Sequence, residues 1–83
     1  MKFFLKSSAL KQLKKLPAEV QKRIIRKLEF FCEQEDPLEF CEPLASAELG
    51  SYRFRIGDYR VIFDIIDTRI DILTIGHRRD IYR

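Results

Sequence analysis

Three arginines fall within eight residues of this chain, at positions 53, 55 and 60 of the segment YRFRIGDYR. No lysine follows Lys27, so every later basic side chain except His77 is an arginine. A guanidinium stays charged at any physiological pH, and its planar fork matches two phosphate oxygens, whereas a lysine ammonium acts as a point charge. Arg53, Arg55 and Arg60 therefore predict a surface that binds phosphate groups.

A second group of chemically active side chains closes the sequence, in GHRRDIYR. The proton of a histidine moves near neutral pH, an arginine stabilises phosphate charge through paired hydrogen bonds, and a tyrosine can stack on a nucleobase. His77, Arg78, Arg79 and Tyr82 supply all three kinds of group. Beside the three earlier arginines, they indicate chemistry on a nucleic acid.

Strands must position the earlier arginines. Alternating apolar residues predict strands over Tyr52–Ile56, Tyr59–Ile66 and Ile70–Ile75. Gly57-Asp58, between the first two, is typical of a two-residue hairpin turn.

The hairpin determines which arginines meet. Side chains alternate between the two faces of a strand, so the apolar residues of the first strand share one face while Arg53 and Arg55 share the other. A two-residue turn pairs Ile56 with Tyr59 and places Arg55 opposite Arg60. Like charges directly opposite one another destabilise a sheet. We therefore expect an anion to lie between Arg55 and Arg60 for part of the protein's working cycle.

The register of the last strand has two alternatives. With Asp67-Thr68 as a two-residue loop, Asp64 faces Asp71 and His77 lies on the same face as the arginines. A three-residue loop removes the contact between the two aspartates and turns His77 toward the other face. We prefer the first register, because Arg69 could bridge the two aspartates diagonally. In both registers Ile62, Ile66 and one apolar set of the last strand lie outside the face that the helices cover, which suggests a surface covered by a partner, by the C-terminal tail or by the proline-containing loop.

The first half of the chain predicts a strand and two helices. Lys2–Lys6 is short, aromatic and flanked by lysines, as a first strand would be. Ser7 and Ser8 can cap a helix that ends near Leu16, and Pro17 separates it from a second helix over Ala18–Glu35. Both helices carry an apolar stripe at helical spacing.

The order of the elements predicts the fold class. Residues 36–50 show no clear period and contain two prolines, so we interpret them as a loop that could contain a helical turn. The resulting order is β-α-α-β-β-β. We expect an α+β fold with an N-terminal strand and an antiparallel helical hairpin packed on one face of a small, largely antiparallel four-stranded sheet.

Composition limits the kinds of protein this can be. The 83 residues fit one domain, over residues 1–83, and contain no apolar run long enough to span a membrane, so we expect a cytoplasmic protein. Residues 1–28 carry nine lysines and arginines against one acid, whereas residues 29–50 carry seven acids and no base. Such blocks favour a polyanionic partner or a solvated lysine-rich helix face. Cys32 and Cys41 lack ligands at metal spacing, so we expect reduced thiols, no metal site and no cofactor.

Several segments together resemble one known family. YRFRIGDYRVIFDI followed by GHRRDIYR, the LKKLP break at residues 13–17 and the PL-containing loop resemble the RelE/ParE superfamily of toxins from toxin–antitoxin systems, most closely its RelE-like branch. The resemblance implies a metal-independent endonuclease that cuts mRNA on the ribosome. In that reaction the 2′-hydroxyl of the RNA attacks the adjacent phosphate and leaves a 2′,3′-cyclic phosphate.

The resemblance also implies roles for individual residues. Arg60 matches the arginine that holds the scissile phosphate, and Arg78 matches a phosphate stabiliser or proton donor. Tyr82 matches a tyrosine that stacks on a nucleotide, although the spacing is two residues shorter here. Arg53 and Arg55 occupy positions where some members have lysines, and with Arg79 we assign them to phosphate binding.

The general base is left open by this assignment. Arginine is a poor base, because its pKa lies above about 12. The base could be His77, or the reaction could rely on electrostatic stabilisation alone.

The family implies partners and leaves two alternatives. The expected partners are a cognate antitoxin, the ribosome with its mRNA, and operator DNA through the antitoxin complex only. One alternative is a ParE-like toxin directed at DNA gyrase. The other is a non-catalytic member that binds the antitoxin and acts within the repressor complex.

Overall fold

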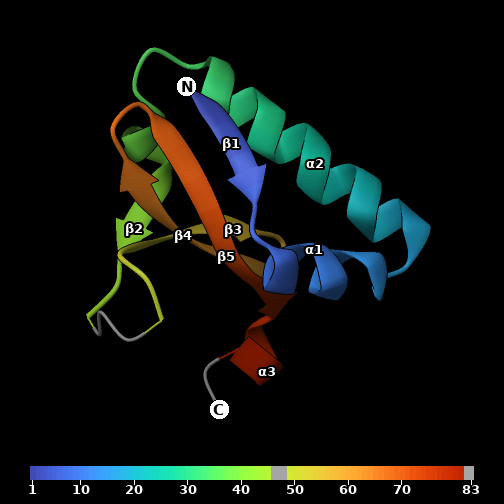
Figure 1. Cartoon of the computed structure of the whole chain (residues 1–83). Coiled ribbons are helices and arrows are strands. Elements are labelled where there is room, and N and C mark those ends of the chain that lie inside the picture. Colours follow the sequence, from blue (N-terminus) through green and yellow to red (C-terminus); the bar gives the residue numbers. More distant parts are fainter. Residues whose placement is uncertain (46–48, 82–83) are drawn as a thin grey trace.

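The computed structural model describes residues 1–45 and 49–81 and shows two helices on one side of a five-stranded sheet (Figure 1). The elements follow the order β1 (Lys2–Leu5), α1 (Ser7–Lys14), α2 (Ala18–Glu33), the 3-10 helix η1 (Pro37–Phe40), β2 (Cys41–Pro43), β3 (Tyr52–Ile56), β4 (Tyr59–Ile66), β5 (Arg69–His77) and α3 (Arg78–Ile81). The predicted α+β class and the β-α-α-β-β-β layout are confirmed. One addition changes the count of strands, because β2 joins the sheet from the segment expected to be a loop.

The strands are arranged in the order β1-β5-β4-β3-β2. β1 runs parallel to β5, and all other neighbours are antiparallel. β2 pairs with β3 through Cys41, Glu42 and Pro43, which extends the sheet at its far edge. The sheet therefore has five strands rather than the four expected.

The helices bury their apolar stripes against the sheet. Ala9 and Leu13 of α1, and Ile24 and Leu28 of α2, are buried in one cluster with the apolar residues of β3, β4 and β5. Gln21 at the start of α2 donates hydrogen bonds to the carbonyls of Leu16 (2.8 Å) and Lys14 (3.3 Å), which ties the short connection to both helices. Within the described residues, no helix is both long enough and apolar enough to cross a bilayer.

α1 also closes part of the open edge of β5. β1 pairs only with residues 69–72 of β5, so the next residues have no strand on that side. The Ser8 hydroxyl donates to the Leu73 carbonyl (2.9 Å), and the Ile75 N–H donates to Gln12 Oε1 (2.8 Å). Ser8 was expected to cap α1, but the N-terminus of this helix has no side-chain cap, and the Ser8 hydroxyl bonds to the sheet instead.

The register of β5 is the preferred one at its start and is shifted at its end. Ile66 pairs with Arg69 and Asp64 pairs with Asp71, as a two-residue loop at Asp67-Thr68 requires. Arg69 Nε lies 3.0 Å from Asp71 Oδ1 and Lys6 Nζ lies 3.5 Å from Asp71 Oδ2. The carboxylate of Asp64 instead accepts the backbone N–H of Ser51 at 2.8 Å, so the expected bridge from Arg69 to both aspartates is wrong.

A β-bulge then changes the face of His77. Ile62 pairs with Thr74 while Phe63 pairs with Ile72, so Leu73 is an extra residue in β5. An extra residue reverses the alternation of every side chain that follows it. His77 consequently pairs with Tyr59 and lies on the helix side, and the prediction that it shares a face with the arginines is wrong.

Candidate functional site

Arg53, Arg55 and Arg60, here called the arginine cluster, lie on the side of the sheet opposite the helices. The predicted hairpin register is confirmed, because Ile56 pairs with Tyr59 and Arg55 pairs with Arg60. Gly57 has φ of +60°, a left-handed conformation that glycine adopts without steric cost, and this permits the tight turn. The turn thus brings two guanidinium-bearing positions face to face.

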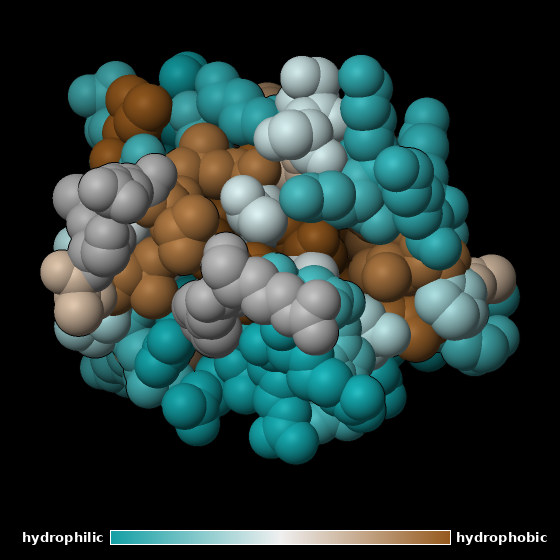
Figure 2. Space-filling view, turned by 90° about the horizontal axis from the view of Figure 1, so that it is seen from below, coloured by the Kyte–Doolittle hydropathy of each residue, from teal (hydrophilic) through white to brown (hydrophobic). Residues whose placement is uncertain are grey.

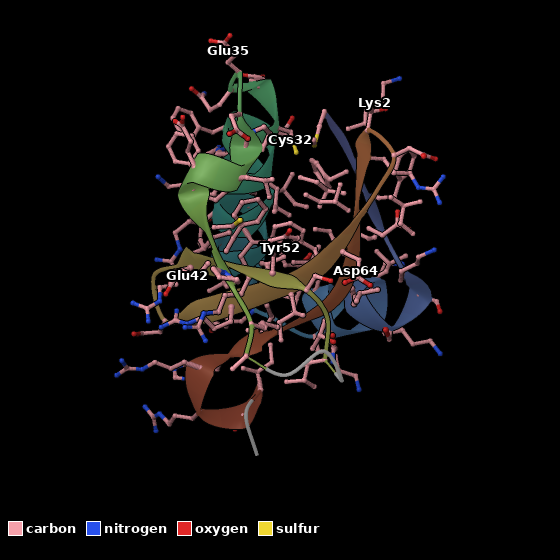
Figure 3. The ribbon with its side chains drawn as sticks, turned by 90° about the vertical axis from the view of Figure 1, so that its left-hand side faces the viewer. Lys2, Cys32, Glu35, Glu42, Tyr52 and Asp64 are labelled. Atoms are coloured by element: carbon pink, nitrogen blue, oxygen red, sulfur yellow. The ribbon has the colours of Figure 1, made fainter. Side chains whose placement is uncertain are left out.

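Glu42 of β2 lies within the arginine cluster. Glu42 Oε1 lies 2.6 Å from Arg55 Nε, and Glu42 Oε2 lies 3.3 Å from Arg53 Nη2. Figure 3 shows Glu42 beside nitrogen-tipped side chains. Glu42 is therefore an internal counter-ion for Arg53 and Arg55.

Arg60 is held by its own hairpin. Its side chain is buried, with the residue only 8% exposed, and Nη1 donates to the carbonyls of Gly57 and Tyr59, both at 2.9 Å. Among the residues that the structure describes, none of the ion pairs includes Arg60. Arg60 therefore has a fixed guanidinium whose charge no described carboxylate neutralises.

The apolar residues on this side of the sheet are partly covered. Ile62 is fully buried, and a β-carbon at Gly50 would lie 2.6 Å from its Cγ2 atom, so the loop before β3 lies directly over it. Ile66 and Leu49 stay exposed. Seen from below, hydrophobic atoms form a band bordered by hydrophilic residues (Figure 2). The proline-containing loop, one of the three covers expected for this apolar surface, thus covers part of it.

The cysteines offer no nucleophile at this site. Burial raises the pKa of the Cys32 thiol, and burial together with the charges of Asp36 and Glu42 raises the pKa of the Cys41 thiol. A raised pKa keeps a thiol protonated near neutral pH, and the protonated form is a poor nucleophile and metal ligand. In residues 1–45 and 49–81, no three His, Cys, Asp or Glu side chains are grouped as a metal site would need.

Residues 3–82 match the family described as the ParE toxin of the type II toxin–antitoxin system, parDE. The chain belongs to this family. It is therefore a toxin of the RelE/ParE superfamily, as its sequence predicted. It is also 33% identical over 79 residues to the toxin RelG of Mycobacterium tuberculosis, a match that covers 93% of this chain and 90% of RelG.

Solved structures agree with the family. The toxin resembles a chain of the toxin–antitoxin complex RelBE2 from M. tuberculosis with a TM-score of 0.75 and 28% identity, over 93% of this chain and 96% of that one. It resembles a chain of the archaeal RelE–RelB complex from Pyrococcus horikoshii with a TM-score of 0.72 and 27% identity, over 95% and 96% of the two chains. The RelE-like character expected from the sequence is thus confirmed.

The C-terminal residues of the toxin divide between two places. Arg78 begins α3, where its N–H donates to the Asp58 carbonyl (2.8 Å) and its Nε lies 3.8 Å from Asp58 Oδ1. These contacts fasten Arg78 to the same β3–β4 turn that holds Arg60. Arg79 is exposed on α3, and Tyr82 lies outside the described residues.

His77 lies in a separate pocket of the toxin. Its ring meets the Tyr59 ring edge-on, with 5.5 Å between centroids, and its Nδ1 accepts the backbone N–H of Arg79 at 3.1 Å. Gln12 of α1 and Lys15, directly after it, line the same pocket. The structure therefore brings Arg53, Arg55 and Arg60 together, places Arg78 at the turn beside them, and leaves His77 on the helix side.

The sequence analysis missed Glu42, which the structure places among the arginines. It lies in a segment without clear periodicity, and its strand is only three residues long. One signal was available, since a residue before proline favours the extended conformation, and Glu42 precedes Pro43. That signal predicts a short strand, although it does not predict the strand's partner.

Proposed function

We propose that this toxin is a metal-independent endonuclease that cuts mRNA on the ribosome and thereby blocks translation. The single observation that carries the proposal is the arrangement of a buried, uncompensated Arg60 opposite Arg55, with the Glu42 carboxylate 2.6 Å from Arg55. Cations and a proton acceptor thus lie side by side on one surface. RNA cleavage by an internal hydroxyl needs both.

The proposed chemistry uses the 2′-hydroxyl of the RNA as the nucleophile. A bond forms between the 2′-oxygen and phosphorus, the bond from phosphorus to the 5′-oxygen breaks, and the products are a 2′,3′-cyclic phosphate and a free 5′-hydroxyl. The pentavalent intermediate gains negative charge, which preorganised donors stabilise strongly. Arg60 would supply such a donor, with Arg53 and Arg55 beside it and Arg78 at the adjoining turn as further cations, and Arg79 of α3 is assigned to binding RNA phosphates.

The proton steps need one acceptor and one donor. A carboxylate can accept the proton of the 2′-hydroxyl, which a guanidinium with a pKa above about 12 cannot. We assign the acceptor to Glu42, because it lies among the arginines, whereas His77 lies on the helix side. Arg78, at the β3–β4 turn, is the candidate donor to the 5′-oxygen, and Tyr82 is the candidate stacking residue.

The partners follow from the family. The M. tuberculosis and P. horikoshii relatives were solved as toxin–antitoxin complexes, which supports a cognate antitoxin for this chain. The antitoxin would cover the arginine cluster and so block RNA, and operator DNA would be bound only through that complex. The site of action would be the cytoplasm, where ribosomes carry mRNA.

A cell-free translation reaction tests the proposal. Wild-type toxin should cleave ribosome-bound mRNA and leave a 2′,3′-cyclic phosphate, and an Arg60→Ala, Arg78→Ala double variant should lose at least about 100-fold in rate. The control is Lys11→Ala, Lys14→Ala, which removes two exposed charges from α1 and should cleave normally. Intact mRNA with folded wild-type toxin, or full activity in the double variant, would overturn the proposal.

One observation favours a second function. The matching family is described as ParE toxins, and a ParE-like toxin would act on DNA gyrase. Gyrase-dependent DNA breaks with intact mRNA would support that function over RNA cleavage. Normal growth of cells that express the toxin without antitoxin would instead support a non-catalytic member of the family.

A further inference from the structure

The short helix that begins with Arg78 cannot hold its own position. α3 has only four residues, and a helix of this length is unstable alone, because its first turn fixes several residues for a single hydrogen bond. Its place therefore depends on contacts with the rest of the toxin. The first N–H groups of any helix lack partners within it, so they are available for such contacts.

The first two N–H groups of α3 both have acceptors outside the helix. The Arg78 N–H donates to the carbonyl of Asp58 at 2.8 Å. The Arg79 N–H donates to Nδ1 of His77 at 3.1 Å, as it would to the side chain of an N-cap residue. Neither α1 nor α2, which both lie within the described residues, has a side-chain cap at its N-terminus. Among the α-helices of the described chain, this cap thus belongs to the one that carries Arg78.

The ring of His77 is held in the orientation that the cap requires. It meets the Tyr59 ring edge-on, with 5.5 Å between centroids. A ring nitrogen accepts a hydrogen bond only while it carries no proton, so the neutral ring has its proton on Nε2. The Nδ1 lone pair of His77 is therefore already used by the backbone of α3, on the helix side of the sheet.

The β3–β4 turn joins α3 to the guanidinium of Arg60. The carbonyls of Gly57 and Tyr59 accept Nη1 of Arg60, both at 2.9 Å. The carbonyl of Asp58, between them, accepts the N–H of Arg78. Three consecutive carbonyls thus set the position of Arg60 relative to the start of α3.

Packing contacts hold both the turn and α3 in place. A β-carbon at Gly57 would lie 3.8 Å from both Cζ and Nη2 of Arg23, so the turn lies against α2. A β-carbon at Gly76 would lie 3.8 Å from Cδ1 of Ile81, so the end of α3 lies against β5. The turn and the short helix are therefore attached to different parts of the same domain.

We propose that His77 is a positioning residue, which fixes α3 so that Arg78 and Arg60 act on the same phosphate. This inference rests on the proposed cleavage of RNA and gives His77 a role in it other than proton transfer. A displacement of about 1 Å can cost a reaction about 100-fold in rate, whereas binding of RNA depends mainly on summed charge. Loss of the cap should therefore lower kcat and leave the affinity for RNA nearly unchanged.

Two substitutions at His77 separate positioning from proton transfer. Asparagine is among the best N-cap residues and does not titrate, so His77→Asn keeps an acceptor and removes the imidazole, whereas His77→Ala removes both. Single-turnover cleavage of ribosome-bound mRNA should be about 10- to 100-fold slower in His77→Ala and within about 3-fold of wild type in His77→Asn. Short single-stranded RNA should bind both variants within about 3-fold of wild type. Equal slowing of cleavage by both substitutions would overturn the inference and assign proton transfer to His77.

A double-mutant cycle tests whether His77 acts through Arg78. Residues that act through one another are not additive, so His77→Ala should slow an Arg78→Ala toxin by less than about 3-fold. The full effect of His77→Ala in that background would overturn the inference. Lys15→Gln is the matched control, because it removes an exposed cation from the same pocket and leaves the cap. It should cleave normally, and slowing equal to that of His77→Ala would assign the effect to the pocket instead.

The attachment of α3 can be measured without cleavage. In ¹H–¹⁵N NMR spectra at mildly alkaline pH, the ring of His77 should carry its proton on Nε2 and none on Nδ1. The amide resonance of Arg79 should shift strongly in His77→Ala and less in His77→Asn. A proton on Nδ1 would overturn the inference whatever the activity. The expected spectra in a toxin that leaves mRNA intact would refute the proposed cleavage and support the attachment of α3 by His77.

Discussion

Two surfaces of the toxin carry several cations each: the arginine cluster, and the α2 cationic face formed by Lys22, Arg23, Arg26 and Lys27. They differ in the partners that the protein itself gives to those cations. In the arginine cluster, Glu42 pairs with Arg53 and Arg55, and two carbonyls hold Arg60. On the α2 cationic face the side chains are exposed, and among the described residues only Lys22 forms an ion pair, with Glu19. One surface has fixed geometry, and the other has mainly charge.

This difference matches two different tasks. Catalysis needs donors that already lie where transition-state charge develops, because reorganising them during the reaction would cost free energy. Docking to a polyanion needs many weak contacts, and their strength depends on salt. Internal partners therefore mark the surface where we expect chemistry, and their absence in the described residues marks the surface where we expect docking.

The largest effect should come from replacing the fixed guanidinium by another cation. Arg60→Lys keeps the charge but removes the planar fork that bonds two carbonyls and that, in the proposed function, also binds a phosphate, so cleavage should fall about 100-fold or more. Ribosome binding should change less than about 3-fold. Single-turnover cleavage and ribosome co-sedimentation measure the two effects. A fully active Arg60→Lys toxin would show that charge alone suffices in both regions and would remove the distinction.

Glu42→Gln should slow cleavage less than Arg60→Lys does, and it should also change the affinity for RNA. Loss of the proposed proton acceptor should slow cleavage about 10- to 100-fold, and the pH dependence of the rate should flatten on its acidic side. Short single-stranded RNA should bind several-fold more tightly, because Arg53 and Arg55 lose their internal counter-ion. A pH–rate profile and an RNA titration measure both changes.

Two variants serve as controls for Glu42→Gln. Glu39→Gln removes an exposed acid of η1 and should change neither rate nor RNA affinity. His77→Ala should preserve the acidic side of the pH profile if Glu42 is the acceptor. A flattened acidic side in His77→Ala, with a normal profile in Glu42→Gln, would transfer the role to His77.

The smallest effect should come from the glycine between the two regions. Gly57→Ala places a β-carbon at φ of +60°, which costs about 1–2 kcal/mol for an ordinary residue. The free energy of unfolding should therefore fall by about 1 kcal/mol in a urea titration, with cleavage reduced only a few-fold. Gly76→Ala is the control, because its β-carbon would only touch Ile81 at an ordinary distance of 3.8 Å. Equal losses of stability and cleavage in Gly57→Ala and Gly76→Ala would show that the turn at Gly57 has no special role between the two regions.

Local rules predicted the part of the site that lies within one hairpin. Alternation and the Gly57-Asp58 turn were sufficient to place Arg55 opposite Arg60, because both strands and the turn are contiguous. They were not sufficient to predict the position of Glu42, whose partner strand begins ten residues later. They also did not predict the face of His77, because the bulge at Leu73 places this side chain on the helix side. Pairing between distant segments depends on the whole sheet, and a single extra residue leaves no clear trace in an alternating pattern.

The hydrogen bonds from α1 to β5 have a consequence for association between copies. A strand edge with free N–H and C=O groups is a template on which another chain can add a strand and aggregate. Ser8 and Gln12 occupy two of those groups at Leu73 and Ile75, just where β1 ends. An incoming strand would have to break both bonds and displace the helix. The first helix thus protects the toxin against sheet-to-sheet polymerisation along this stretch.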